Sequence, residues 1–423
     1  MNSPLNLRFQ SIAMIFERSV RLVGGVFVSV AIARYLGPDQ LGLLVYAQTV
    51  VVILVVLSAA GTDVISLKWF MSGEFDDRSL LVNIAFLRLI LATIIQIILL
   101  ILLLQYYDDD IRSIAILGAM IFFSSFDSVQ KLYESRGRGH VAALARFIGF
   151  IVSAALKIIF VFYEMSFDYF LYAIIAESFV IMCFVGCLHY KEVGISKGKV
   201  LSVNKMYKLA KQSSPLVIST VTALAYNSVA IFLIKYIMDD RSVGIYSVAT
   251  RLSEAWFSLL SVAVVSIAPK IIVLAAESES ESEYEKKVSR IYGFAAYVCI
   301  AVALFVTCIS EWVIPLLFGE VFSDASGILM LHIWAGVFVV WRQISGQFLI
   351  ANNQVSQHVK RFVFGLIFNI SLCLLLIPLW GLLGAAVASL TSHIFVGYIF
   401  DLLYKTTRRH FILKTFSLVV KKS

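Results

Sequence analysis

The sequence predicts an all-α integral membrane protein with about twelve transmembrane helices, arranged as two six-helix repeats around a central cavity. Three observations lead to this fold class. The 423-residue chain is 60% hydrophobic and only 15% charged, with a mean hydropathy of +0.90, which is too apolar for a soluble protein of this length. Long stretches carry no charge at all, and a hinge-like motif occurs twice, about 200 residues apart.

The uncharged stretches set the number of helices. Val50–Ala60, Leu89–Leu104 and Phe294–Cys308 contain no charged residue. A membrane-spanning helix needs about 20 mostly apolar residues, because each residue advances the helix by only 1.5 Å. On this criterion the predicted spans are residues 11–34, 41–62, 80–104, 111–132, 141–163, 168–188, 214–237, 244–271, 291–318, 326–351, 358–380 and 382–404.

The duplicated motif relates the two halves of the chain. Arg34 and Tyr35 correspond to Lys235 and Tyr236, and Gly42 corresponds to Gly244 after a slip of one residue. Each copy is a short polar hinge between two apolar runs. In membrane proteins, two related halves are typical of transporters whose binding site lies between the repeats.

A second correspondence supports the duplication and sets the domain boundaries. Arg146-Phe147-Ile148 opens the fifth predicted span, and Arg361-Phe362-Val363 opens the eleventh. Six spans per half preserve the starting side, so the repeats are expected to run parallel about an axis along the membrane normal. The predicted parts are an N-terminal six-helix bundle (1–190), a cytoplasmic linker (191–213), a C-terminal six-helix bundle (214–404) and a basic cytoplasmic tail (405–423).

Basic residues predict the orientation. With the N-terminus inside, about 24 of the 35 Lys and Arg fall on inner segments, and about four fall outside. This bias predicts that both termini are cytoplasmic. The net charge of +8 therefore reflects topology and attraction to anionic membrane lipids, with no need for a nucleic-acid partner.

The sequence gives no sign of a metal or an organic cofactor. The five cysteines all fall inside predicted spans, where a cysteine is usually a small buried apolar residue. His332 and His393 are isolated in the sequence, which favours a structural role over metal binding. No phosphate-binding loop or nucleophile motif is present, so neither ATP hydrolysis nor enzymatic chemistry is expected.

Charged residues within the spans are the candidate site. An ionised side chain at mid-membrane costs about 2.5–3.5 kcal/mol on insertion scales, so it is retained for a function or a partner. A guanidinium donates two parallel hydrogen bonds to phosphate oxygens. The predicted diphosphate-binding residues are Arg18, Arg21, Arg251 and Arg342.

An alternative interpretation makes these charges structural. In that case they would form compensated pairs that hold helices in register: Glu17 with Arg21, Arg251 with Glu254, and Lys157 with Glu177. Cations at membrane depth outnumber acids, however, and this favours an anion site. Acidic residues within the spans also suggest ion coupling, with a proton or a sodium ion bound at Glu17, Asp63 or Glu254.

The two halves differ in their charges. In the repeat alignment, Arg18 and Arg21 correspond to Ser219 and Thr222, and Arg251 corresponds to Val50. The cavity is therefore expected to be electrically unequal, which suits a cargo with one anionic end.

Three motifs resemble those of a known transporter family. The segment Ala33–Gly42 (ARYLGPDQLG) is followed by an apolar span that ends at Gly61-Thr62-Asp63. Near the C-terminus, Leu376–Gly381 (LIPLWG) precedes Gly384–Ser389 (GAAVAS). Over essentially its whole length the chain resembles the polysaccharide-biosynthesis, O-antigen (Wzx-type) flippases of the multidrug/oligosaccharidyl-lipid/polysaccharide exporter superfamily.

This resemblance implies a function and a location. Such flippases move an undecaprenyl-diphosphate-linked oligosaccharide from the inner to the outer leaflet of the bacterial inner membrane by alternating access. The resemblance also implies partners, namely the polyprenyl-diphosphate-linked glycan and, beside the flippase, polysaccharide polymerase and chain-length machinery. The alternative is an ion-coupled drug/cation antiporter of the multidrug and toxin extrusion (MATE) type, which shares the fold but is expected to have an acidic cavity.

Overall fold

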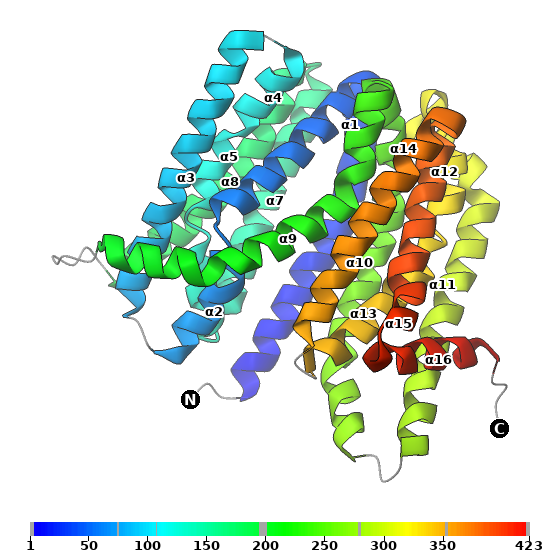
Figure 1. Cartoon of the computed structure of the whole chain (residues 1–423). Helices are drawn as coiled ribbons and strands as arrows, with labels where there is room; N and C mark the ends of the chain where they lie inside the picture. Colours follow the sequence, from blue (N-terminus) through cyan, green and yellow to red (C-terminus); the bar gives the residue numbers. More distant parts are fainter. Residues whose placement is uncertain are drawn as a thin grey trace. The chain divides into compact units, whose positions relative to one another are not determined.

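The computed structural model describes residues 4–73, 76–106, 108–193, 201–277, 281–351 and 354–419. These residues form helices and short connections, without a β-strand (Figure 1). The chain divides into two compact units: Met1–Leu36 with Leu43–Leu224, and Gly37–Gly42 with Ala225–Ser423. The chain changes unit within α1 (Pro4–Ser58), at both ends of Gly37–Gly42, and again within α9 (Val203–Ile237).

The first unit holds most of α1 and the helices up to the first part of α9. Their bounds are α1 (Pro4–Ser58), α2 (Thr62–Ser72), α3 (Asp77–Tyr106), α4 (Asp109–Leu117), α5 (Ala119–Ser124), α6 (Ser128–Ser135), α7 (Gly139–Phe162) and α8 (Phe167–Val193).

The second unit continues to the C-terminus. It contains the rest of α9, then α10 (Asp240–Glu277), α11 (Glu281–Phe318), a 3-10 turn η1 (Glu320–Phe322), α12 (Ala325–His332), α13 (Ala335–Ala351), α14 (Val355–Ile394), a π-helical turn η2 (Phe395–Ile399), α15 (Phe400–Leu403) and α16 (Lys405–Val419).

Every predicted span coincides with helix. Among the described residues, nine helical stretches are long and apolar enough to cross a membrane. Two of them, Phe16–Ser58 and Ser356–Leu403, each contain two predicted spans, and the predicted span 244–271 lies within α10. The all-α transmembrane class is therefore confirmed.

Glycine and proline separate the paired spans. Gly37 has φ +70° inside α1 and is followed by Pro38, which has no N–H to donate to the helix ladder. Gly381 has φ +57° inside α14, three residues after Pro378. Only glycine adopts such angles without strain, so these positions fix where each long helix bends.

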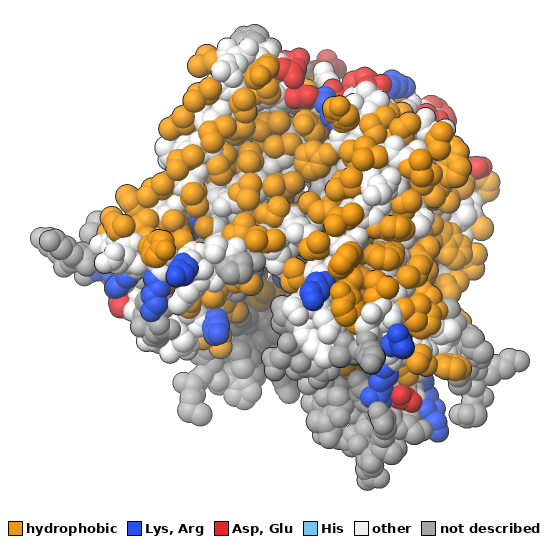
Figure 2. Space-filling view, in the orientation of Figure 1, with side chains coloured by type: hydrophobic (Ala, Val, Ile, Leu, Met, Phe, Trp, Pro, Cys, Tyr) orange, Lys and Arg blue, Asp and Glu red, His pale blue; other side chains and the backbone are white. Residues whose placement is uncertain are grey.

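The surface of each unit fits a lipid environment. Figure 2 shows that hydrophobic side chains cover a broad band on each unit, with Lys and Arg beyond one edge of that band. On α3, Ile94 and Ile98 are exposed, and on α14 Leu375 and Leu379 are exposed. Large aliphatic side chains on outward helix faces are stable in hydrocarbon but not in water. The chain is thus a multi-pass membrane protein.

Much of the predicted cytoplasmic linker is helical. Residues 194–200 lie outside the described part of the chain, but α9 already begins at Val203. Its first turns are anchored to the first unit: Lys205 donates to Ser79 (2.9 Å), Leu209 is buried, and Ser213 donates to the carbonyl oxygen of Ala60 (2.6 Å). Local contacts therefore order a segment whose composition had suggested a loop.

The two hinge motifs meet inside the second unit. A Cβ added to Gly42 would lie 1.8 Å from the carbonyl oxygen of Asp240, and one added to Gly244 would lie 2.0 Å from that of Pro38. Pro38 and Asp240 each stand four residues before the glycine of their own hinge. The contact is therefore reciprocal, and the repeated glycines allow two backbones to approach closely.

Candidate functional site

The second unit contains a pocket of about 310 Å³ that brings together two of the predicted site residues, Arg342 and Glu254. Helices α9, α10, α12, α13 and α14 all contribute to its wall. The lining residues are Tyr226, Asn227, Ile231, Tyr246, Thr250, Glu254, Phe257, Ser258, Ser261, His332, Val339, Arg342, Gln343, Ser389 and His393.

Arg342 is the cation of this pocket. Its guanidinium carbon lies 4.8 Å from the ring centre of Phe362 and 5.8 Å from that of Tyr226. Its Nε and Nη1 atoms are buried and, among the described residues, have no hydrogen-bond partner. The faces of these aromatic rings stabilise the positive charge of the guanidinium, but they accept no strong N–H hydrogen bond. The free N–H groups are therefore available to an anionic ligand.

Glu254 lines the same pocket and is exposed to it, whereas Arg251 is not among the lining residues. Within the described part of the chain these two side chains form no ion pair with each other, although they lie three residues apart on α10. The charges of Arg251 and Glu254 still interact electrostatically, as the structural alternative expects, but over more than the length of an ion pair.

Two histidines that are far apart in the sequence meet beside this pocket. The ring centres of His332 and His393 are 6.2 Å apart, and both residues are buried. His332 Nδ1 lies 2.7 Å from Ser253 Oγ, and His393 Nδ1 lies 3.2 Å from the hydroxyl of Tyr226. Among the described residues, no group of three His, Cys, Asp or Glu could hold a metal ion.

Sequence reasoning missed this histidine pair. His332 is on α12 and His393 is on α14, and no local spacing connects them. The sequence does show that each histidine is a polar residue in an apolar span. A polar residue there needs a buried partner, but the sequence does not identify that partner.

The predicted residues of the first unit form an ion network. Arg21 is bonded to Glu177 and lies 3.8 Å from Glu17, which in turn lies 3.6 Å from Arg146. Glu17 is only 3% exposed. The Glu17–Arg21 pair of the structural alternative is thus present, while Glu177 pairs with Arg21. Arg18 is exposed and has no ion-pair partner among the described residues.

Asp63 also has a partner. Its carboxylate lies 2.6 Å from Nη2 of Arg88, a guanidinium that is only 2% exposed. Arg88 Nε also donates to Thr62 Oγ1 (2.8 Å), so α2 and α3 are joined by a mostly buried polar cluster. An acid that neutralises a buried arginine has a structural role already.

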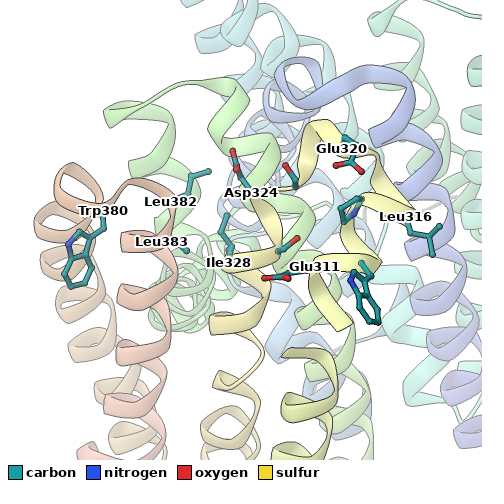
Figure 3. Close-up of a pocket in the computed structure, with 13 residues that line it drawn as sticks. Glu311, Leu316, Glu320, Asp324, Ile328, Trp380, Leu382 and Leu383 are labelled. Atoms are coloured by element: carbon teal, nitrogen blue, oxygen red, sulfur yellow. The ribbon is translucent and has the colours of Figure 1, made fainter. Parts of the chain in front are cut away.

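A second, larger pocket of about 1020 Å³ lies elsewhere in the second unit and contains none of the predicted site residues. Figure 3 shows its three carboxylates, Glu311, Glu320 and Asp324, which come from the end of α11, from η1 and from the connection to α12. None of the described residues that line it is a lysine or an arginine. Its charge opposes an anion, so the smaller pocket around Arg342 is the candidate site for the predicted cargo.

Comparisons with known structures agree with this architecture. The chain is similar to an inward-facing multidrug resistance MATE family transporter of the MOP superfamily (TM-score 0.73, 15% identity, covering 96% of this chain and 99% of that one). It is also similar to the lipid II flippase MurJ in an inward closed conformation (TM-score 0.74, 13% identity, 97% and 91%). A MOP superfamily transporter from Pyrococcus furiosus, described as having a binding pocket of reverse polarity, matches with TM-score 0.61 at 14% identity (99% and 98%).

The chain therefore shares the fold of these membrane transporters. A family model described as polysaccharide biosynthesis protein matches residues 31–327, which is most of the chain. The chain belongs to this polysaccharide biosynthesis protein family. No curated protein sequence matches it significantly.

Proposed function

We propose that the protein is a flippase that moves undecaprenyl-diphosphate-linked oligosaccharide, the repeat unit of an O-antigen, capsule or exopolysaccharide, from the inner to the outer leaflet by alternating access. It acts in the bacterial inner membrane with both termini in the cytoplasm. Family membership and the fold shared with a lipid II flippase support this class of cargo.

One observation carries the assignment of the site: Arg342 has buried N–H groups with no acceptor among the described residues, in a pocket large enough for a diphosphate. A buried donor without a partner costs about 1–3 kcal/mol, and a phosphate oxygen would remove that cost. The two aromatic rings beside Arg342 hold the guanidinium in place before the ligand arrives. The sugar end of the cargo would remain outside this small pocket.

The other predicted residues take secondary roles in this proposal. Arg18 and Arg251 do not line the pocket around Arg342 and stay predicted anion contacts outside it, while Arg21 is already bonded to Glu177. Glu254 is the coupling carboxylate for a proton or sodium ion, because Glu17 and Asp63 are each paired with arginine. Polymerase and chain-length proteins would receive the product on the outer side.

A drug/cation antiporter of the MATE type is the second candidate. It is favoured by the likeness to MATE transporters and by Glu254, an acid in the same pocket as Arg342 that has no ion pair within 4 Å among the described residues. In that case Glu254 would bind the cation, and Arg342 would be dispensable for transport.

The decisive experiment measures outer-leaflet diphosphate-linked glycan in the native strain. Deleting the protein should abolish this pool, and R342A should reduce it about tenfold or more at wild-type protein levels, because a charged hydrogen bond contributes about 1.5–3 kcal/mol. R342K should restore it only partly, since an ammonium cannot form the paired bonds of a guanidinium.

The matched control is R290A, which removes an exposed arginine of α11 outside the pocket and should leave the pool unchanged. An unchanged pool after deletion would exclude the flippase. Normal transport by R342A would exclude the proposed diphosphate contact, and sensitivity of the deletion strain to cationic drugs would favour the antiporter.

A further inference from the structure

The C-terminal helix α16 turns a lysine inward. Ile412 and Phe416 are exposed on one face of this helix, whereas His410 and Lys414 are buried on the other. Lys414 has 0% exposure. In Figure 1, α16 (red) runs across the direction of α11, against which it packs. An amphipathic helix held only by the membrane surface would direct its lysine to water, so this orientation points to a partner inside the protein.

That partner is Asp401 of α15, which is also 0% exposed. Lys414 Nζ donates to Asp401 Oδ2 (2.6 Å) and to the carbonyl oxygen of Gly397 (2.7 Å). Gly397 belongs to the π-helical turn η2, whose wider hydrogen-bond ladder is a feature often found at functional sites. Lys414 Nζ also reaches Ser345 Oγ of α13 (3.4 Å), so a single lysine contacts α15, η2 and α13 at once.

Asp401 connects this contact to α13. Its second oxygen, Oδ1, accepts a hydrogen bond from Nη2 of Arg361, on α14, which is also fully buried. The Nη1 atom of Arg361 donates to Ser345 Oγ (2.9 Å) and reaches the backbone carbonyl oxygen of Arg342 (3.4 Å). The chain of contacts that begins at α16 therefore ends on the residue whose side chain lines the candidate pocket.

The charges of this cluster exceed what stability requires. Arg361 alone would neutralise Asp401, yet Lys414 adds a second buried cation to the same carboxylate. Removing an ion from water costs several kcal/mol, and buried ion networks are often no more stable than apolar replacements. The additional lysine therefore requires an explanation other than stability.

We propose that Lys414 is a positioning residue for Arg342, so that docking of α16 sets the geometry of the cargo-binding guanidinium. This inference rests on the proposed function. By occupying Oδ2 of Asp401, Lys414 leaves only Oδ1 for Arg361. The Nη1 atom of Arg361 is then directed at Ser345 and at the carbonyl group of Arg342. Without the lysine, Asp401 binds Arg361 through both oxygens and withdraws it from α13.

The test is binding of radiolabelled undecaprenyl diphosphate to the purified full-length protein in nanodiscs. K414M should weaken binding about fivefold, the equivalent of about one hydrogen bond, while the protein remains folded because Asp401 keeps Arg361 as its partner. K414R should restore binding. R408M removes a cation from the exposed face of the same helix and should have no effect.

A double-mutant comparison separates positioning from general loosening of the structure. In an R342A background, K414M should weaken binding no further, because the residue through which it acts is absent. S345A removes the hydroxyl group that both Arg361 and Lys414 contact, without changing any charge, and it should reproduce the K414M effect even if K414M does not fold.

The outcomes distinguish this inference from the proposed function. If R342A binds the lipid normally, the proposed site is wrong, and the positioning role is excluded with it. If R342A weakens binding but neither K414M nor S345A does, only the positioning role is overturned. The positioning role would also be overturned if K414M weakened lipid binding equally in the wild-type and R342A backgrounds. A general structural defect would act whether or not Arg342 is present.

Discussion

At the scale of single residues, the buried lysine of α16 has a consequence for pH dependence. Burial lowers the pKa of Lys414 from 10.5 to about 8, while neighbouring Asp401 raises it. Between these values the unfolded lysine holds a proton that the folded one has released, so the free energy of unfolding rises with pH in this window. The other charged or titratable groups around it are Arg361, His410 and Tyr292.

We expect wild-type protein to gain stability relative to K414M as the pH is raised from about 8 to about 10. The measurement is the difference between the two thermal unfolding midpoints, taken in one detergent across that range. Because both proteins share all their other titratable groups, the difference between their midpoints removes most of the pH dependence that those groups cause. A constant difference would show that the pKa of Lys414 is not lowered by folding.

At the scale of helices, the hinge glycines provide a prediction of their own. The obstacles to a Cβ at Gly42 and at Gly244 are backbone atoms, which cannot rotate away as side chains do. G42A and G244A should therefore each destabilise the protein by about 1–3 kcal/mol, the usual cost of overpacking. Thermal unfolding of the purified variants measures this loss.

Gly25 provides the matched comparison, because it is helical and a Cβ there would meet nothing within 4 Å. G25A should be neutral or stabilising by up to about 1 kcal/mol, since alanine is the better helix former. Equal behaviour of G25A and G42A would mean that the hinge contact is looser than the structure shows.

The helices also show which features local sequence can reveal. Apolar length located the predicted spans, and the first polar hinge, which contains Gly37 and Pro38, lies where α1 departs from helical geometry. Composition could not reveal that Ser213 binds the carbonyl group of Ala60, so the first turns of α9 were predicted as linker. Arg361 was recognised only as a repeat position, because its partner Asp401 lies 40 residues further along the chain.

The candidate site was harder to predict than the fold for the same reason. Charge and depth identified Arg342 and Glu254, which line one pocket. Charge and depth could not separate Arg342 and Glu254 from Arg21 or Asp63, whose partners Glu177 and Arg88 come from other helices. Depth within a span shows that a charge needs a partner, but only the fold shows whether that partner is protein or ligand.

At the scale of the whole molecule, the distribution of bases predicts which ends of the helices face the cytoplasm. The acidic connection before α4 is expected outside, and α16 with the C-terminus is expected inside. If α16 is cytoplasmic, the lysine that we propose to position Arg342 acts from the side where the cargo is loaded. Orientation therefore bears on the mechanism as well as on localisation.

This orientation is testable by cysteine labelling in intact cells. In a variant with Cys183, Cys187, Cys299, Cys308 and Cys373 replaced by alanine, D109C and R408C each place one thiol on an exposed position. A membrane-impermeant maleimide should label D109C before lysis and R408C only after it, provided that both variants retain transport. Labelling of R408C in intact cells would place α16 outside and reverse the predicted topology. In that case the contacts from Lys414 to Arg342 would act on release of the cargo, because they would lie on the side to which the cargo is delivered.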